Sequence, residues 1–333
     1  MLSTIYSFDI EMQMFLRSIV EASRSSFTIR ELNESSDENS KKLSHLGKTL
    51  RGFMVTKSVN LKSVNKISTY SLSCPTKPMR TDVTVFETTT SKPTITLNHA
   101  HLIRVIKRVA TVIQHLQQLQ NTTPLRVYIL PLPHRKVLVK PIGPLDPQNI
   151  NGGFYAPNEH LIVIYRREEY PKVFLHEVIH AVTPTIFETL KCKRVTSRIL
   201  VDEAIVETLA VIYHSALLVV GSRKQTISVI KELIERERSW CTRLKDNLAA
   251  VYDWPQKPWI EKTNAFSYIF VRSALMADLD GFIGAWLAFG QSNDATALVK
   301  YVKSKLSNIY ELNLSPSLSP TKMGLQMTRY GSL

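Results

Sequence analysis

His176 and His180 stand four residues apart in the run YPKVFLHEVIH, which occupies positions 170–180. Pro171 suits the first turn of a helix, because the N–H that it lacks would have no partner there. On such a helix both imidazoles project from one face, and this spacing allows two neutral nitrogens to bind one Zn²⁺. Glu177, beside the first histidine, could then take a proton from a zinc-bound water. A chance H-E-x-x-H pattern on a buried helix is the alternative.

The segment Arg198–Val220 is strongly apolar and predicts a buried helix whose polar exceptions share one stripe. These exceptions are Glu203, Glu207 and His214. They share one face because Glu207 and His214 follow Glu203 by four and eleven residues, and both steps return to nearly the same angle around a helix. A catalytic zinc takes three protein ligands, and Glu203 is predicted to be the third. Glu207, one turn later, is predicted to accept a hydrogen bond from a histidine ligand and to fix its tautomer. Pairing of Glu207 with an Arg or Lys is the alternative.

A β-hairpin is predicted just before the histidine helix, with strands at 151–155 and 160–165. Gly153 and Phe154 lie in its first strand. An exposed strand edge beside a metal-binding helix could bind an extended peptide as a further strand, so both residues are predicted to contact substrate. The pair Gly152-Gly153 would let another backbone approach closely. A simple turn ahead of the hairpin explains these glycines equally well.

Apolar periodicity predicts the remaining elements and a division of the chain. Further helices are expected at 5–21, 101–119, 224–252, 264–279, 282–289 and 295–306, and short strands at 127–130 and 137–139. Residues 22–91 are rich in Ser, Thr, Asn and Lys, and Ser35–Ser40 is interpreted as a solvated loop. The predicted division is a partly disordered extension at 1–95, a main domain at 96–312 and a disordered tail at 313–333. The main domain is divided into a part with the sheet and the histidine helix, 96–184, and a helical part with the third ligand, 185–312.

Composition restricts the partners and the compartment. The formal charge of +14 suggests acidic partners, but the basic residues are scattered, which favours a solvated basic surface over specific nucleic-acid binding. The three cysteines, Cys74, Cys192 and Cys241, form no disulfide framework, which indicates a reducing compartment. Asp9 and Glu11 argue against a secretory signal, and no apolar run is long enough to span a membrane. An intracellular, cytoplasmic protein that is not secreted and binds no membrane is expected.

The sequence HEVIH at 176–180, followed by DEAIVE at 202–207, resembles the gluzincin clan of zinc metallopeptidases, the thermolysin-like group. In that group an H-E-x-x-H helix is followed by a second helix with an E-x-x-x-D/E element, and an edge strand ahead of the first helix aligns the substrate. Asp202 stands where the group often has Asn, and Glu207 where it often has Asp. The resemblance covers roughly residues 97–215 and is specific for the clan rather than for one family.

The resemblance implies an α+β fold, with a zincin-like metallopeptidase domain in which a small twisted sheet packs on the active-site helix and a mainly helical subdomain follows. It implies one Zn²⁺ per chain, bound by His176, His180 and Glu203. Peptide or protein substrates would be hydrolysed by a zinc-activated water, with Glu177 as general base.

Members of the clan supply a second donor to the oxyanion from a Tyr or His in a later segment. Tyr268 is the predicted donor here, because it is central in the polar stripe Asn264, Tyr268 and Arg272 on an apolar helix. Tyr213 and His214 are the alternatives. Arg272, on the same stripe, is a candidate for binding a substrate carboxylate or carbonyl, but an internal salt bridge is the preferred interpretation.

A zincin fold that binds peptides without turnover, around a structural zinc, is the alternative function. Glu177 argues against it, because a structural site gains nothing from a base beside the metal.

Overall fold

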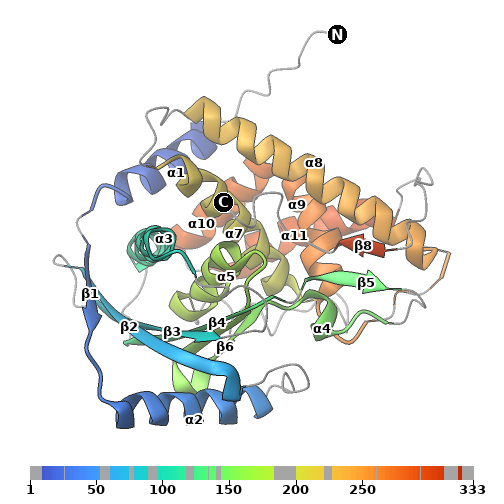
Figure 1. The fold of residues 1–333 in the computed structure, drawn as a ribbon. Helices are drawn as coiled ribbons and strands as arrows, with labels where there is room; N and C mark the ends of the chain where they lie inside the picture. The colour runs from blue at the N-terminus through green and yellow to red at the C-terminus, as the bar shows by residue number, and fades with distance from the viewer. Residues whose placement is uncertain are drawn as a thin grey trace.

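The computed structural model describes residues 10–25, 27–52, 61–74, 79–88, 97–117, 124–133, 135–139, 144–183, 200–220, 227–254, 256–257, 259, 261–292, 294–310 and 322–324. Within these residues a six-stranded sheet is covered by most helices on one face and by helix α2 on the other (Figure 1). The chain therefore has the mixed α+β character that its sequence predicts.

The sheet begins with strands from the N-terminal third of the chain and ends with the predicted hairpin. Its spatial order is β1 (Thr28–Leu32), β2 (Val64–Cys74), β3 (Met79–Thr88), β4 (Leu125–Leu132), β7 (Leu161–Arg166) and β6 (Gly153–Ala156). The three central strands β3, β4 and β7 run parallel, and the outer pairs are antiparallel. Because β6 is the last strand, one of its backbone edges has no strand beside it in the described sheet.

Helix α5 (Tyr170–Val182) carries the histidine motif and lies at the centre of the helical layer. The preceding residue, Glu169, has a left-handed backbone (φ 59°), and Pro171 occupies the first turn as predicted. The helix packs against α3 (His99–Gln117), α7 (Val201–Val219), β6 and β7. Nearly all of its side chains are buried, including the charged Lys172 and Glu177.

The outer helices cover α5 and α7. They are α1 (Ile10–Ala22), α8 (Ile227–Tyr252), α9 (Arg272–Ala277), α10 (Leu279–Ser292) and α11 (Ala295–Tyr310). The predicted helix 264–279 is interrupted: Ser267–Val271 forms a π-helical turn that leads into α9. Such turns occur often at functional sites, and this one includes Tyr268.

On the opposite face, α2 (Ser36–Gly52) packs over a second, smaller core. Leu46 and Leu50 of α2 meet Phe86, Tyr128 and Tyr165 of the sheet there. The expectation of a solvated loop at Ser35–Ser40 is therefore wrong for Ser36–Ser40, which begins this helix. Ser35 caps its start, since its hydroxyl accepts a hydrogen bond from the N–H of Glu38 (3.2 Å).

The expectation of a separate extension at 1–95 also fails for the described residues. Strands β1, β2 and β3 belong to the same sheet as β4, and β3 pairs in parallel with β4 across the predicted boundary. Weak apolar periodicity hid these strands, because threonines occupy buried positions. The hydroxyl groups of Thr69 and Thr84, for example, are hydrogen-bonded to each other (3.1 Å) inside the sheet. Threonine is β-branched and, like valine, is common in strands.

Short elements complete the described fold. Helix α4 (Pro147–Ile150) precedes the hairpin, and β5 (Val137–Val139) pairs antiparallel with β8 (Lys322–Gly324). The strand β8 corrects the expectation of a disordered tail for these three residues; the rest of 313–333 lies outside the described residues. No helix in the described ranges has the length and apolarity needed to cross a bilayer.

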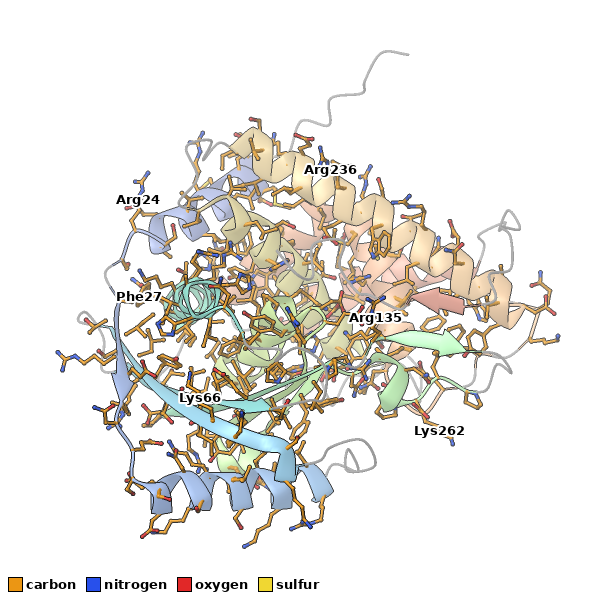
Figure 2. The ribbon with its side chains drawn as sticks, in the orientation of Figure 1. Arg24, Phe27, Lys66, Arg135, Arg236 and Lys262 are labelled. Atoms are coloured by element: carbon orange, nitrogen blue, oxygen red, sulfur yellow. The ribbon has the colours of Figure 1, made fainter. Side chains whose placement is uncertain are left out.

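Basic side chains are spread over the exterior. Arg24, Lys66, Arg135, Arg236 and Lys262 come from different parts of the fold and point outward in different directions (Figure 2). These five basic residues are exposed and do not form one cluster.

Candidate metal centre

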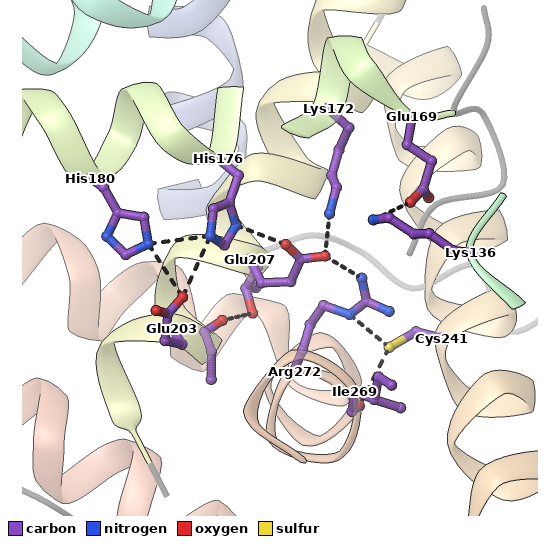
Figure 3. A network of polar contacts seen from close by, with 12 residues as sticks. Lys136, Glu169, Lys172, His176, His180, Glu203, Glu207, Cys241, Ile269 and Arg272 are labelled. Carbon is purple, nitrogen blue, oxygen red and sulfur yellow. Dashed lines mark hydrogen bonds and ion pairs between the residues drawn. The ribbon is translucent and has the colours of Figure 1, made fainter. Parts of the chain in front are cut away.

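Helices α5 and α7 bring three candidate ligands together. His176 Nε2 lies 3.2 Å from His180 Nε2, and the Glu203 carboxylate oxygen lies 3.3 Å from His180 Nε2 and 3.5 Å from His176 Nε2. The three side chains form a group able to hold a metal ion. Figure 3 shows the two imidazoles of α5 above the carboxylate of α7. The sequence therefore predicted correctly which side chains lie together.

These distances match the edges of a metal tetrahedron. Zinc–nitrogen and zinc–oxygen bonds of about 2.0–2.1 Å place tetrahedral ligands about 3.3 Å apart. The observed edges are 3.2, 3.3 and 3.5 Å. The two imidazole nitrogens face each other at 3.2 Å in a mostly buried site, close enough to bind one cation. The donor set fits zinc, although imidazole and carboxylate also bind other divalent ions.

Glu207 supports the first histidine and pairs with two cations. Its carboxylate accepts a hydrogen bond from His176 Nδ1 (2.8 Å), which directs His176 Nε2 toward Glu203. Its other oxygen accepts from Lys172 and from the Arg272 guanidinium (2.9 Å). The predicted histidine contact and its alternative, pairing with Arg or Lys, are thus both present. Figure 3 shows this network converging on Glu207.

The electrostatics of the site favour anionic carboxylates. Burial would raise the pKa of Glu207, but Lys172 and the hydrogen bond from His176 lower it well below its ordinary value. The pKa of Glu203 is likewise lowered, because the two histidines outweigh its burial. For His176 burial alone would lower the pKa, but hydrogen bonds to Glu203 and Glu207 raise it to about 9. Binding of a metal ion to His176 would therefore release a proton, and metal affinity should rise with pH.

Glu177 and Tyr268 line a cavity next to the ligands. Other side chains and glycines complete its lining: Lys136, Ile150, Asn151, Gly152, Gly153, Lys172, Val173, His176 and Glu207. Its volume of about 30 Å³ has room for one or two water molecules. Glu177 is only 7% exposed, and burial raises the pKa of its carboxyl, which makes it a stronger base.

The Tyr268 ring meets the His176 ring edge-on, with centroids 5.8 Å apart. Burial and the nearby carboxylates, Glu203 foremost, raise the pKa of Tyr268 well above its ordinary value, so its hydroxyl remains a donor. Asn264 of the same polar stripe donates to the second oxygen of Glu203 (3.3 Å). The stripe predicted for this segment therefore does face the ligands.

Strand β6 approaches α5 and β7 closely at its glycines. A Cβ atom at Gly153 would lie 2.8 Å from the carbonyl oxygen of Val163 and 3.0 Å from a methyl group of Val173. Close approach therefore explains this glycine better than a simple turn does. The Phe154 side chain packs with Tyr165 on the α2 face (ring centroids 6.3 Å apart). Phe154 also occupies a position opposite Val163 whose backbone groups point toward β7, so neither its side chain nor its backbone groups face the predicted substrate edge.

Three predicted or alternative site residues have structural partners instead of the roles considered for them. Arg272 is 1% exposed and pairs with Glu207, so the prediction that it binds substrate is wrong and the internal salt bridge is correct. Tyr213 is buried and bonds His115 (2.7 Å), and His214 is buried outside the cavity lining, so neither replaces Tyr268.

Two lysines at the site were missed by the sequence analysis. Lys172 lies one turn before His176 on α5, and Lys136 pairs with Glu169 (2.8 Å) beside the same cavity. The signal for Lys172 was its position on a helix that is otherwise buried, where an idle charge is unfavourable. Lys136 carries no such signal, because its neighbours in sequence have no clear periodicity.

Comparisons with family models, with curated proteins and with solved structures give no match for this chain. Its function must therefore be argued from the site itself.

Proposed function

We propose that the chain is a zinc metallopeptidase of the gluzincin type with a zincin-like fold. The observation that carries the proposal is the triangle of His176, His180 and Glu203, whose edges of 3.2–3.5 Å fit a tetrahedral zinc. Glu177 beside this triangle supplies the base that a hydrolytic site requires, and a purely structural site would not need it.

The proposed roles follow from the position of each side chain. Bound zinc would lower the pKa of its water to about 7 and polarise the scissile carbonyl. Glu177 takes the proton from the attacking water and delivers it to the leaving amine. Glu207 holds the tautomer and orientation of His176. The Tyr268 hydroxyl donates to the oxyanion that forms at the scissile carbon.

The edge of β6 is the proposed substrate-aligning strand. Tyr165 N–H donates to the Gly152 carbonyl (3.0 Å), and hydrogen-bonded pairs alternate along an antiparallel ladder. The backbone groups of Gly153 and Tyr155 therefore point away from β7, toward the open edge. A peptide that pairs there would lie beside α5 and the metal ligands.

Metal analysis combined with a peptide-library cleavage assay tests the proposal. The purified protein should contain one zinc per chain and lose cleavage activity with a chelator. The Glu177→Gln variant should keep its zinc and its fold but lose hydrolysis, because an amide cannot accept the proton. Full metal occupancy in a His176→Ala/His180→Ala variant, or wild-type cleavage by Glu177→Gln, would contradict it.

A further inference from the structure

Lys136 is a buried cation that the proposed reaction does not use. It is 2% exposed, and its ammonium group forms an ion pair with Glu169 (2.8 Å). An ammonium group has three N–H donors, and Glu169 is its one partner within the described residues. Lys136 also lines the cavity beside His176 and Glu177. A buried ammonium with unused donors at the wall of a cavity indicates a site for an acceptor.

Asn151 supplies a second donor at the same cavity. Its side-chain oxygen accepts a hydrogen bond from the Thr263 hydroxyl (3.3 Å), which orients the amide. The amide nitrogen is then the free end, since no acceptor for it occurs within the described ranges. Ile150 and Val173 form apolar walls between these polar groups.

Lys172 makes this part of the cavity more favourable for an anion. Figure 3 shows the ammonium groups of Lys136 and Lys172 pointing into the same region, on the side of Glu207 away from His180. Burial lowers the pKa of Lys136, Glu169 raises it, and the like charge of Lys172 lowers it again. Glu207, which also lines the cavity, already accepts bonds from Lys172, Arg272 and His176, so its repulsion of an added anion is reduced.

We propose that Lys136 and Asn151 form a carboxylate-binding pocket that selects the part of the substrate next to the scissile bond. The cavity of about 30 Å³ has room for the oxygens of one carboxylate but not for a large side chain. The carboxylate is either the C-terminus of a short peptide or the side chain of an acidic residue. This inference rests on the proposed function and names its substrate class.

Binding of paired peptides to the zinc-loaded Glu177→Gln protein, measured by titration calorimetry, tests the pocket without requiring turnover. One pair compares a free C-terminal carboxylate with its amide, and the other compares Asp with Asn in a peptide blocked at both ends. The acid should bind about 10- to 100-fold more tightly than the amide in one pair, because charge-assisted hydrogen bonds are the stronger ones. That pair identifies the source of the carboxylate.

Variants assign the preference to Lys136. Adding Lys136→Met together with Glu169→Gln removes both charges, so no buried carboxylate is left without a partner. The acid and the amide peptides should then bind with about equal affinity. Lys136→Met alone could unfold the chain by stranding Glu169. The control makes the same two changes in a different ion pair, the partly buried Lys42 and Glu34 (Lys42→Met with Glu34→Gln), and should retain the preference.

Three results would overturn the pocket. The first is equal binding of acid and amide in both pairs. The second is a preference that survives the Lys136→Met/Glu169→Gln change. The third is a preference that disappears when zinc is removed by a chelator, because the carboxylate would then be a metal ligand. Cleavage by the wild-type protein separates the two proposals: cleavage without acid preference rejects the pocket alone, whereas acid preference without cleavage rejects the proposed function alone.

Discussion

Three donors share the carboxylate of Glu207, namely His176 Nδ1, Lys172 and Arg272. An outer carboxylate usually raises the basicity of a metal-bound histidine, since it attracts the Nδ1 proton. Two cations on the same carboxylate weaken that attraction. Glu207 therefore orients His176, and it would raise the basicity of this histidine toward a bound metal less than an unpaired carboxylate would.

Replacing Glu207 should affect both metal binding and folding. Glu207→Ala should weaken zinc affinity by about 10- to 100-fold, the usual effect of losing an outer partner of a ligand. It should also lower the free energy of unfolding by about 3–5 kcal/mol, because two buried cations lose their partner. Glu207→Gln keeps an acceptor for His176, so its zinc affinity should fall less. Chelator competition and urea unfolding measure the two quantities, and unchanged zinc affinity in Glu207→Ala would leave only a structural role.

Tyr268 can be tested by removing one atom. Tyr268→Phe keeps the ring that contacts His176 but removes the hydroxyl donor. If the hydroxyl stabilises the oxyanion, kcat should fall by about 10²–10³ while zinc content and KM change little. Tyr301→Phe is the control, because the Tyr301 hydroxyl donates to the Asp278 carbonyl (2.7 Å) rather than facing the cavity. Equal kcat values for Tyr268→Phe and the wild type would reject the assignment.

At the scale of elements, His115 of α3 links three helices. Its Nε2 bonds the Ser18 hydroxyl of α1 (2.7 Å), and its Nδ1 bonds the Tyr213 hydroxyl of α7 (2.7 Å). Phe15 of α1 packs edge-on against both rings. These contacts hold α7, the helix that carries Glu203 and Glu207, against α1 and α3.

The His115 link predicts a loss of stability in acid. Burial lowers the pKa of His115 from 6.5 to about 4. As the pH falls from about 6.5 toward 4, the unfolded chain binds the proton first, so the free energy of unfolding decreases over this window. The loss due to His115 is at most about 3 kcal/mol. His115→Gln cannot titrate, so its unfolding free energy should decline less than that of the wild type; parallel curves from pH 7 to 4 would contradict this.

The elements that position the site were predictable because their sequences carry local signals. Helix α5 and the hairpin β6–β7 occur where the sequence places them, since Pro171 suits a helix start and residues 161–165 form a short continuous apolar run. The sequence could not decide whether Glu207 pairs with Lys172 and Arg272, because this pairing depends on how α5, α7 and α9 pack against one another. Strands β2 and β3 were missed, because Thr69 and Thr84 are polar in sequence but buried and mutually bonded in the sheet.

At the scale of the whole molecule, residues from both sides of position 95 form one core. Met12, Leu16 and Ile19 of α1 are fully buried, and they belong to the same cluster as Val83 of β3 and Phe174 of α5. Helix α1 packs against α3, α7, α8 and α10. The part of the chain that resembles a gluzincin therefore depends on the N-terminal part for its sheet and for the cover of its helices.

A fragment of residues 96–333 should therefore not fold into a metal-binding unit. It would expose the edge of β4, which pairs with β3 in the full chain. It would also lose the burial of Met12, Phe15, Leu16 and Ile19. At about 1.5–3 kcal/mol each, these four side chains alone contribute about 6–12 kcal/mol, comparable to the whole net stability of a typical domain.

Circular dichroism, thermal unfolding and zinc content of the fragment measure the effect. Co-expression with residues 1–95 should restore zinc binding, whereas a fragment that unfolds cooperatively and binds zinc like the full chain would refute this dependence.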